Sequence, residues 1–211
     1  SLPRISKKGA QTILRHVNVR IEQGSRIGLG PATEIASSVI SELEERCPQI
    51  TRIQVAGSVR RAAELVGDIN IVCAVKNDSD KATVIDAFTI LSNTHDVSSH
   101  DGSKATYTDQ SGLGFGLKVV TEEAWPGALV YATGSISHGT RLEELAKAKR
   151  LVLSPDGLFE SGDLSTPVEL NTEQDVYDRL GLGFVPPEMR EDTGEIEVAA
   201  SSDFSQMLTM D

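Results

Sequence analysis

Alternation of apolar and polar positions predicts that residues 68–75 form a strand with one buried face. The apolar positions of this segment are Ile69, Ile71, Cys73 and Val75. Because successive side chains of a strand point to opposite faces, Asp68 and Asn70 are expected side by side on the other face. Residues 50–56 form a second apolar run of strand length, which predicts a further strand. The pattern therefore predicts a sheet that presents a carboxylate and an amide together.

Helical spacing of apolar residues is found in the segment before these strands. Pro31 stands at the start of an apolar stripe, and Pro48 ends it. The stripe consists of Ala32, Ala36, Val39, Ile40, Leu43 and Cys47. Further helices are predicted at residues 8–17, 80–91, 123–133 (interrupted by Pro126 and Gly127), 137–150 and 172–180. Further strands are predicted at residues 96–99, 105–108, 113–120, 151–153 and 157–159.

The strand predicted at residues 113–120 is rich in glycine. Its inward positions are Phe115, Leu117 and Val119, and its other face carries Gly114, Gly116 and Lys118. Glycine weakens a strand and often marks the close approach of another group. We therefore expect something to pack closely on the glycine face.

Composition and charge describe an ordinary globular protein, with 39% hydrophobic and 24% charged residues. No apolar run approaches the ~20 residues that cross a bilayer, so no membrane association is expected. Cys47 and Cys73 lie far apart on apolar positions, which favours buried thiols in a reducing cytoplasm. The net charge of −11 is uneven, because residues 1–20 carry five basic groups and residues 160–211 carry thirteen acidic groups. Net charge alone is therefore a poor guide to partners.

A candidate phosphate-binding turn follows the first predicted strand, at Gly57-Ser58-Val59-Arg60-Arg61. Glycine lets the backbone approach a phosphate, and the serine hydroxyl and backbone N–H groups donate hydrogen bonds to it. The two arginines add positive charge. Gly-Ser alone is more often a plain turn, but here Gly67-Asp68-Ile69-Asn70 follows at a short distance. A phosphate-binding turn beside an acidic strand is typical of a site that holds a nucleotide and its metal ions.

These blocks resemble the family X DNA polymerases, which include DNA polymerase beta and bacterial enzymes with a polymerase-and-histidinol-phosphatase (PHP) domain. The family pattern of Gly-Ser, Arg-Arg and Gly-Asp matches residues 57–61 and 67–68. Residues 131–135, with His138, are similar to the family's hinge between palm and nucleotide-binding subdomain. Residues 151–192 resemble the bacterial members, and residues 2–10 resemble the remnant of a helix-hairpin-helix element.

The resemblance implies an α/β (α+β) fold, with a nucleotidyltransferase-type palm built on a mixed sheet and a small α/β thumb-like subdomain. The expected divisions are the end of a helix-hairpin-helix region (1–24), the palm (25–133), the thumb-like subdomain (134–190) and an acidic linker or tail (191–211). The ordered part is expected to close at Pro186-Pro187. The N-terminal DNA-binding domain and C-terminal PHP domain of such proteins would then lie outside this sequence.

The resemblance also implies roles for individual residues. Asp68 falls on the first metal carboxylate and is the expected catalytic residue, with Asn70 beside it as the second metal position. The expected nucleotide-binding residues are Gly57, Ser58, Arg61, Gly67, Tyr131 and Gly134. The expected DNA-binding residues are Arg4, Lys7 and Lys8. The implied partners are gapped or primer-template DNA and a deoxynucleoside triphosphate, with Mg²⁺ or Mn²⁺ as cofactor if the site is active.

Departures from the family pattern concentrate at the chemistry. Asn70 and Gly116 stand where the second and third metal carboxylates belong. Further replacements are Ala132 for an aromatic near the sugar, Gly139 and Glu143 for an Asn and an Arg that contact the base pair, and Arg4 and Ser6 for the hairpin glycines. Two Mg²⁺ ions ~4 Å apart need several carboxylates, and their loss implies a rate loss of order 10³ or more.

Several alternatives stay open at this point. Lys118 shares a face with Gly116, so its ammonium either occupies the metal position and neutralises Asp68 or is a solvated or DNA-facing base. Glu64 and Asp109 are conceivable substitute ligands. The four histidines, His16, His95, His100 and His138, have no metal-ligand spacing and are expected in exposed loops.

Two functions are therefore expected, in a cytoplasmic, nucleoid-associated location. One is a DNA polymerase core that fills gaps in DNA repair with a degenerate, impaired two-metal site. The other is a catalytically inactive scaffold that binds DNA or nucleotide and positions a PHP nuclease domain. The first predicts metal-dependent primer extension that Asp68→Ala abolishes, and the second predicts binding that this change does not affect.

Overall fold

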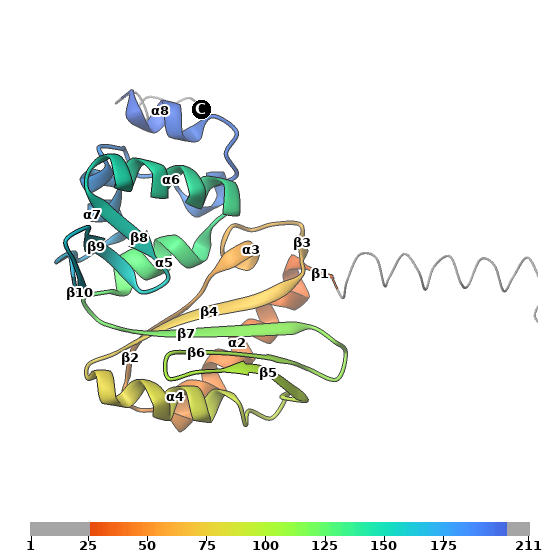
Figure 1. The fold of residues 1–211 in the computed structure, drawn as a ribbon. Coiled ribbons are helices and arrows are strands. Elements are labelled where there is room, and N and C mark those ends of the chain that lie inside the picture. Colours follow the sequence, from red (N-terminus) through yellow and green to blue (C-terminus); the bar gives the residue numbers. More distant parts are fainter. Residues whose placement is uncertain (1–25, 202–211) are drawn as a thin grey trace, which may run out of the picture.

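The computed structural model describes residues 26–201. The larger of its two parts is built on a mixed five-stranded sheet (Figure 1). The strand order is β2-β4-β7-β6-β5, with β4 and β7 parallel and the other neighbours antiparallel. The strands are β2 (Ile50–Val55), β4 (Asp68–Val75), β7 (Gly114–Thr121), β6 (Lys104–Thr108) and β5 (Asp96–His100). The register of β4 on β7 sets Asp68 beside Gly114 and Asn70 beside Gly116.

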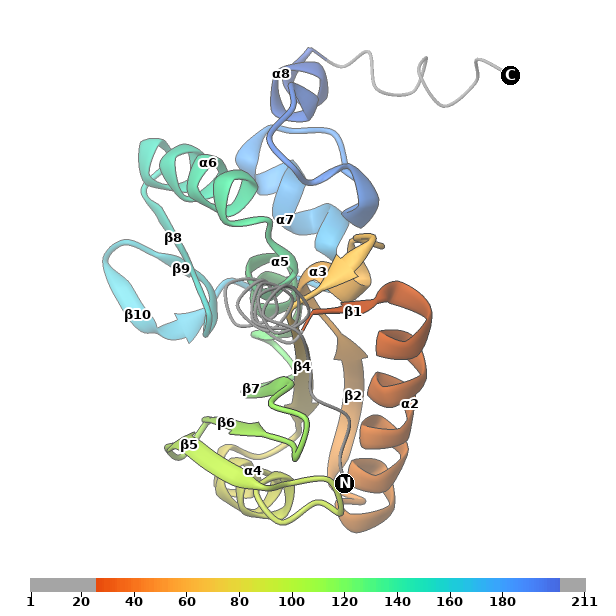
Figure 2. The same cartoon turned by 90° about the vertical axis from the view of Figure 1, so that its right-hand side faces the viewer.

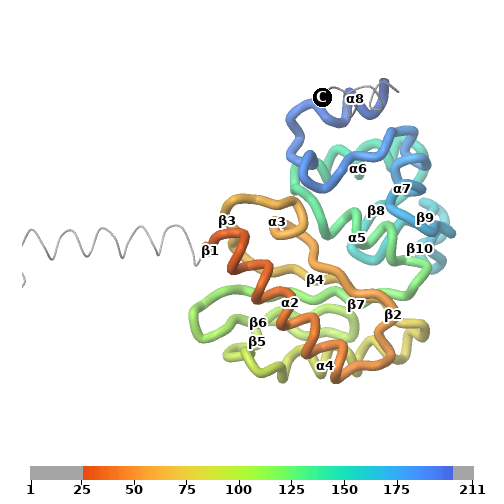
Figure 3. The backbone as a smooth tube through the Cα atoms, turned by 180° about the vertical axis from the view of Figure 1, so that it is seen from behind, coloured from red at the N-terminus to blue at the C-terminus, as the bar shows by residue number. Residues whose placement is uncertain are grey.

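Two helices cover one face of this sheet, α2 (Leu29–Arg46) and α4 (Lys81–Phe88), the latter after the 3₁₀ turn η1 (Asp78–Asp80). Figure 3 shows α2 running across this face. Pro31 lies in the first turn of α2, where a missing N–H breaks no intrahelical bond. The buried side chains beneath the two helices include Val39, Leu43, Ile69, Ile71, Cys73, Val84, Phe88, Phe115 and Leu117. This layer is the main core of the protein.

Helix α5 (Trp125–Thr133) packs on the opposite face. Its apolar contacts with the central strands are at Val72 and Ala74 of β4 and Val120 of β7, in the later part of both strands. The short helix α3 (Gly57–Arg60) follows β2, and the strand pair β1 (Ile27–Gly28) and β3 (Leu65–Val66) flanks it. The early part of β4, with Asp68 and Asn70, is therefore left uncovered by α5.

The smaller part of the molecule lies above the sheet in Figure 2 and has its own core. A three-stranded sheet of order β10-β9-β8 is joined by three helices and the 3₁₀ turn η2. These elements are α6 (Ile136–Ala148), β8 (Leu151–Ser154), β9 (Gly157–Glu160), β10 (Asp163–Pro167), α7 (Glu173–Leu180), η2 (Pro187–Met189) and α8 (Glu195–Ala200). Thr172 and Asp175 form a capping box at the start of α7, and Gly181 ends it in the left-handed region.

The predicted fold class, an α/β protein with a mixed sheet and a second, smaller α/β part, is confirmed. The predicted bounds of residues 50–56 and 68–75 agree with β2 and β4 to within one residue. Cys47 and Cys73 are both buried free thiols, as expected. The helix predicted at residues 8–17 lies outside the described residues. Within residues 26–201, no helix is both long and apolar enough to cross a membrane.

Two local predictions were wrong, and one strand was missed. The ordered part does not close at Pro186-Pro187, because η2 and α8 follow, and Ile196 and Ala199 of α8 are buried in the smaller core. Two apolar positions at helical spacing within an acidic segment were too weak a signal. Strand β10 was not predicted, because its residues are mostly exposed. Pro126 and Gly127 lie in the first turn of α5 and do not interrupt it.

Candidate functional site

A pocket of about 360 Å³ lies where the uncovered end of β4 meets α3 and the junction of α5 with α6. Residues from these four elements line it. They are Gly57, Ser58, Arg61, Asp68, Asn70, Tyr131, Ala132, Thr133, Gly134, Ser135, Ile136, Gly139, Thr140 and Glu143. The pocket therefore joins the larger sheet to the smaller part of the molecule.

The predicted nucleotide residues are brought together here with one exception. Gly57, Ser58, Arg61, Tyr131 and Gly134 all line the pocket, as do Asp68 and Asn70. Gly67 does not line it, and lies instead beside the side chain of Arg26. The predicted DNA-binding residues Arg4, Lys7 and Lys8 lie outside the described residues.

The turn after β2 has the local features of an anion seat. Gly57 has a φ of +58°, a conformation that glycine adopts without strain. The Ser58 hydroxyl oxygen is buried and has no hydrogen-bond partner among residues 26–201. A buried hydroxyl without a partner is costly, so a ligand oxygen at this point would satisfy it. Gly134 closes the opposite wall, and an added Cβ there would lie 3.2 Å from a guanidinium nitrogen of Arg61.

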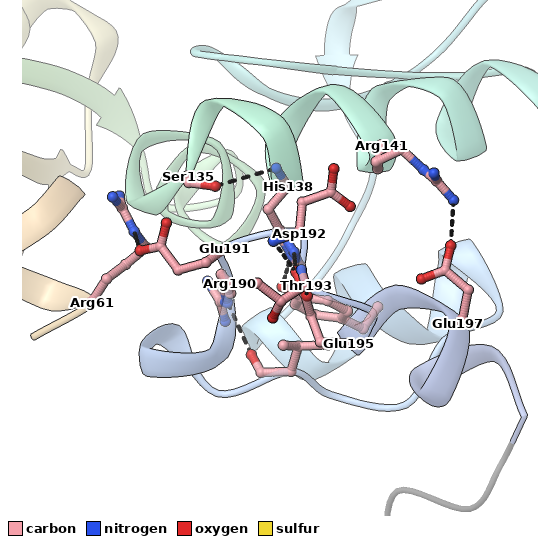
Figure 4. Close-up of polar contacts among 12 residues, drawn as sticks. Arg61, Ser135, His138, Arg141, Arg190, Glu191, Asp192, Thr193, Glu195 and Glu197 are labelled. Atoms are coloured by element: carbon pink, nitrogen blue, oxygen red, sulfur yellow. Dashed lines mark hydrogen bonds and ion pairs between the residues drawn. The ribbon is translucent and has the colours of Figure 1, made fainter. Parts of the chain in front are cut away.

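Arg61 is the cation among the residues that line the pocket, and two of its guanidinium nitrogens have partners. Its Nη1 donates to the backbone carbonyl of Thr133 at 2.6 Å. Its Nε donates to the Glu191 carboxylate at 2.7 Å, as Figure 4 shows. Glu191 is about half exposed, so this contact lies at the edge of the pocket. An incoming anion and Glu191 would therefore compete for the same guanidinium.

Arg60 does not add free positive charge to the turn, contrary to the sequence interpretation, because its guanidinium is paired elsewhere. Its guanidinium donates to the Thr133 hydroxyl and to both carboxylate oxygens of Glu173, on α7. Glu173 also accepts from Arg190 Nη1 at 3.0 Å. Burial raises the pKa of the Glu173 carboxyl, but the bonds to Arg60 and the charge of Arg190 lower it by more. The three charges thus tie α3 to α7 across the two parts of the molecule.

The acidic end of β4 is rebuilt around an amide. Asn70 Nδ2 donates to Asp68 Oδ2 at 2.9 Å. Asn70 Oδ1 lies 2.8 Å from the point where a Cβ on Gly116 would stand, so a larger residue at 116 would displace it. Among residues 26–201 no group of three or more His, Cys, Asp or Glu side chains is placed to hold a metal ion. These donors do not fit a pair of Mg²⁺ ions, which need several anionic oxygens.

The proposed substitutes do not supply the missing charge. Lys118 does not reach Asp68, because its ammonium pairs with Asp156 at 2.6 Å and donates to the Ser103 hydroxyl at 2.9 Å. The hypothesis that it neutralises the metal position is therefore wrong. Glu64 and Asp109 do not line the pocket, and Asp109 accepts bonds from its own loop.

His138 is the main correction among the histidines, because it is buried and not in an exposed loop. Its Nδ1 lies 2.6 Å from Glu195 Oε1, and its Nε2 lies 2.9 Å from the Tyr177 hydroxyl. Glu195 also accepts from the backbone N–H groups of Asp192 and Thr193 (Figure 4). Burial lowers the pKa of His138 despite its carboxylate partner. This cluster anchors α8 beside α6 and holds the segment that carries Glu191.

The α6 wall of the pocket differs in character from the turn. Ile136 is 90% exposed at the pocket rim. Gly139, Thr140 and Glu143 continue the same wall, and Glu143 brings a negative charge. A surface that binds the phosphate backbone of duplex DNA needs cationic side chains, whereas this wall carries an anion. Ala132 also lines the pocket, at the position where the family resemblance implies an aromatic ring near the sugar.

A Gly-Ser turn and a strand with a carboxylate that meet in one pocket, on a mixed sheet with a small α/β part beside it, define a nucleotidyltransferase-like fold. Residues 128–191 match the family model described as the DNA polymerase beta thumb. A protein of Bacillus subtilis (strain 168) named DNA polymerase/3′-5′ exonuclease PolX is 30% identical over an alignment of 205 residues that covers 93% of this chain. The chain is a family X DNA polymerase region. It spans about a third (34%) of that relative's length.

Proposed function

We propose that this chain is a palm-and-thumb region of family X that retains a nucleotide-binding pocket and is impaired in nucleotidyl transfer. The family likeness supports a polymerase-like function, and the pocket supports nucleotide binding. We propose the divisions 1–24, 25–133, 134–190 and 191–211 as helix-hairpin-helix end, palm, thumb and acidic connector. The connector carries an additional short helix, α8.

The bond between Asn70 and Asp68 is the observation that carries this proposal. It couples one oxygen of the single carboxylate at this end of β4 to an amide, at 2.9 Å. Two-metal transfer uses both ions to stabilise the attacking and leaving oxygens. A site that loses this stabilisation loses several kcal/mol, which is a factor of order 10³ or more in rate.

The proposed partners follow from the family and the pocket. They are a deoxynucleoside triphosphate or related nucleotide, and gapped or primer-template DNA, in DNA repair in a cytoplasmic, nucleoid-associated setting. Gly57, Ser58, Arg61, Tyr131 and Gly134 are the proposed nucleotide contacts. Mg²⁺ or Mn²⁺ is the proposed cofactor only if the site is active. In a longer polypeptide, the region would position a PHP nuclease domain.

One observation favours a second candidate, a slow but active polymerase. Asp68 is exposed to the pocket, and among residues 26–201 it has no cationic partner. A single ion bound there could support weak transfer, with Asn70 adding a neutral oxygen. The two candidates differ in whether Asp68 matters for any measured activity.

Primer extension on a gapped duplex, with Mg²⁺ and with Mn²⁺, separates them. We expect the natural chain to extend the primer very slowly or not at all, and an Asn70→Asp/Gly116→Asp variant to extend it. Extension by the natural chain that Asp68→Ala abolishes would establish the second candidate. Extension by neither chain, with both folded by circular dichroism, would overturn the view that only the metal carboxylates are missing.

A further inference from the structure

We propose that this pocket takes a nucleotide with a single phosphate group and takes it without a divalent metal ion. The inference rests on the proposed nucleotide-binding function and deepens it by naming the ligand class. It follows from the mismatch between the metal that the family implies and the side chains at the end of β4.

The amide of Asn70 is one of the groups that line this pocket. The Asn70 side chain lies between two glycines, with Nδ2 3.2 Å from the Cβ position of Gly57 and Oδ1 2.8 Å from that of Gly116. The orientation is consistent with the charges, because it turns the N–H group towards Asp68 and the oxygen away from that carboxylate. Both glycines leave room for this amide and would displace it if they carried side chains. This part of the pocket is therefore shaped for Asn70, not for a carboxylate at 116.

The Asn70 amide also does part of what a cation would do for Asp68. One carboxylate oxygen of Asp68 accepts the amide N–H at 2.9 Å, which stabilises the anion without any ion. A divalent cation at this point would have to compete with that bond and would find one anionic ligand. Mg²⁺ is held in proteins by carboxylates together with substrate phosphates and dehydrates reluctantly. A metal-free pocket is the better match to these groups.

The charges of the lining residues decide how many phosphate groups fit. Arg61 is the one cation among the lining residues, and Asp68 and Glu143 are anions. Arg60 is directed to Glu173 and adds nothing to the pocket. A phosphate group carries about two negative charges, which the guanidinium and the Ser58 hydroxyl can accommodate. A triphosphate without metal would add charge that faces Asp68 with no cation to offset it.

The remaining walls suit the nucleoside. Ile136 presents an exposed apolar side chain at the rim, and Tyr131 lines the same cavity. A base needs one flat apolar contact and a few polar groups, and a volume of about 360 Å³ is in the usual range for small ligands. Phosphate at Ser58 and Arg61 with the base towards Ile136 spans the pocket from α3 to α6. The ligand class is therefore a nucleoside monophosphate.

Titration calorimetry with dAMP and with dATP, each in EDTA and in Mg²⁺, tests this on the whole chain. We expect dAMP to bind at least as tightly as dATP, with Kd changing by less than about threefold between EDTA and Mg²⁺. Arg61→Gln is expected to weaken dAMP binding by about tenfold, since it removes the guanidinium fork. Arg52→Gln, an exposed arginine on β2, is the matched control and should leave Kd unchanged.

Two results overturn the inference in different ways. If Mg²⁺–dATP binds about tenfold more tightly than metal-free dAMP, the pocket is a triphosphate site and the proposed nucleotide-binding function still stands. If the folded chain binds neither nucleotide under any condition, both the inference and the proposed function fail. An Asn70→Asp/Gly116→Asp variant that gains Mg²⁺-dependent dATP binding, with the natural chain indifferent to Mg²⁺, supports the inference independently.

Discussion

The two sides of the pocket have diverged to different degrees. On the α3 side, Gly57, Ser58 and Arg61 lie together in the pocket and are the proposed phosphate contacts. On the β4 side, one carboxylate remains, and the amide of Asn70 occupies the space around it. Phosphate binding needs a few donors, whereas two-metal chemistry needs several carboxylates within a few ångströms. We therefore expect binding and catalysis to be separable in this fold, because different elements would supply them.

The largest expected effect comes from restoring the β4 side. Asn70→Asp/Gly116→Asp should raise the rate of primer extension by a factor of order 10³, because it returns two metal carboxylates. Single-turnover extension of a gapped duplex in Mg²⁺ measures it. Gly116→Asp alone should give a smaller gain, because position 70 would still lack its metal carboxylate. Equal gains from the single and double changes would contradict the need for both carboxylates.

The next effect concerns the contact between the two parts of the molecule. Glu173→Ala leaves the guanidinium groups of Arg60 and Arg190 without their shared carboxylate. Breaking a buried pair from one side typically costs about 3–5 kcal/mol, and we expect a loss of that order. Urea unfolding of both chains at pH 7 gives the difference in free energy. Glu144→Ala, an exposed position on α6, is the control; a similar small loss for both would show that the contact does not stabilise the fold.

The same carboxylate predicts a pH dependence. The pKa of Glu173 in the folded chain lies below its ordinary value of 4.5. Its stabilising contribution is therefore complete above that value and is lost as pH falls through the lower, folded pKa. The free-energy difference between the natural chain and Glu173→Gln should shrink as pH decreases from 7 towards 3. A difference that stays constant over this range would show that Glu173 is not ionised in the folded state.

The smallest expected effect sharpens the α3 side. Glu191→Gln removes the anion that competes for Arg61, so dAMP should bind about fivefold more tightly. The gain is modest because the contact is half exposed and screened by solvent. Titration calorimetry in EDTA measures it, with Glu188→Gln on η2 as the nearby control. Unchanged affinity would show that Glu191 and the ligand do not share the guanidinium.

How much the sequence predicts depends on whether the signal is local. Alternation over residues 68–75 predicted β4 to the residue, and placed Asp68 and Asn70 on one face, because a strand's facing follows from its own period. The partners of Arg60 and Arg61 lie 113 and 130 residues away, and no spacing rule links them. The ion pair of Lys118 with Asp156, in the smaller part of the molecule, could not be predicted for the same reason. The sequence interpretation placed His138 in a loop because its burial depends on contact with Glu195. Glu195 lies in α8, a helix with little apolar pattern.

The join between Arg60 on α3 and Glu173 on α7 also affects how a ligand would enter. It spans the two halves that form the pocket walls, and its side chains are about 11–12% exposed. Because this ion pair already holds the two walls together, the pocket needs little rearrangement to bind a ligand. The conformational entropy lost on binding is therefore small. Stopped-flow traces of ligand binding should then show one concentration-dependent phase, with no slower second phase that reports closure of the pocket. The pocket would behave as a rigid receptor.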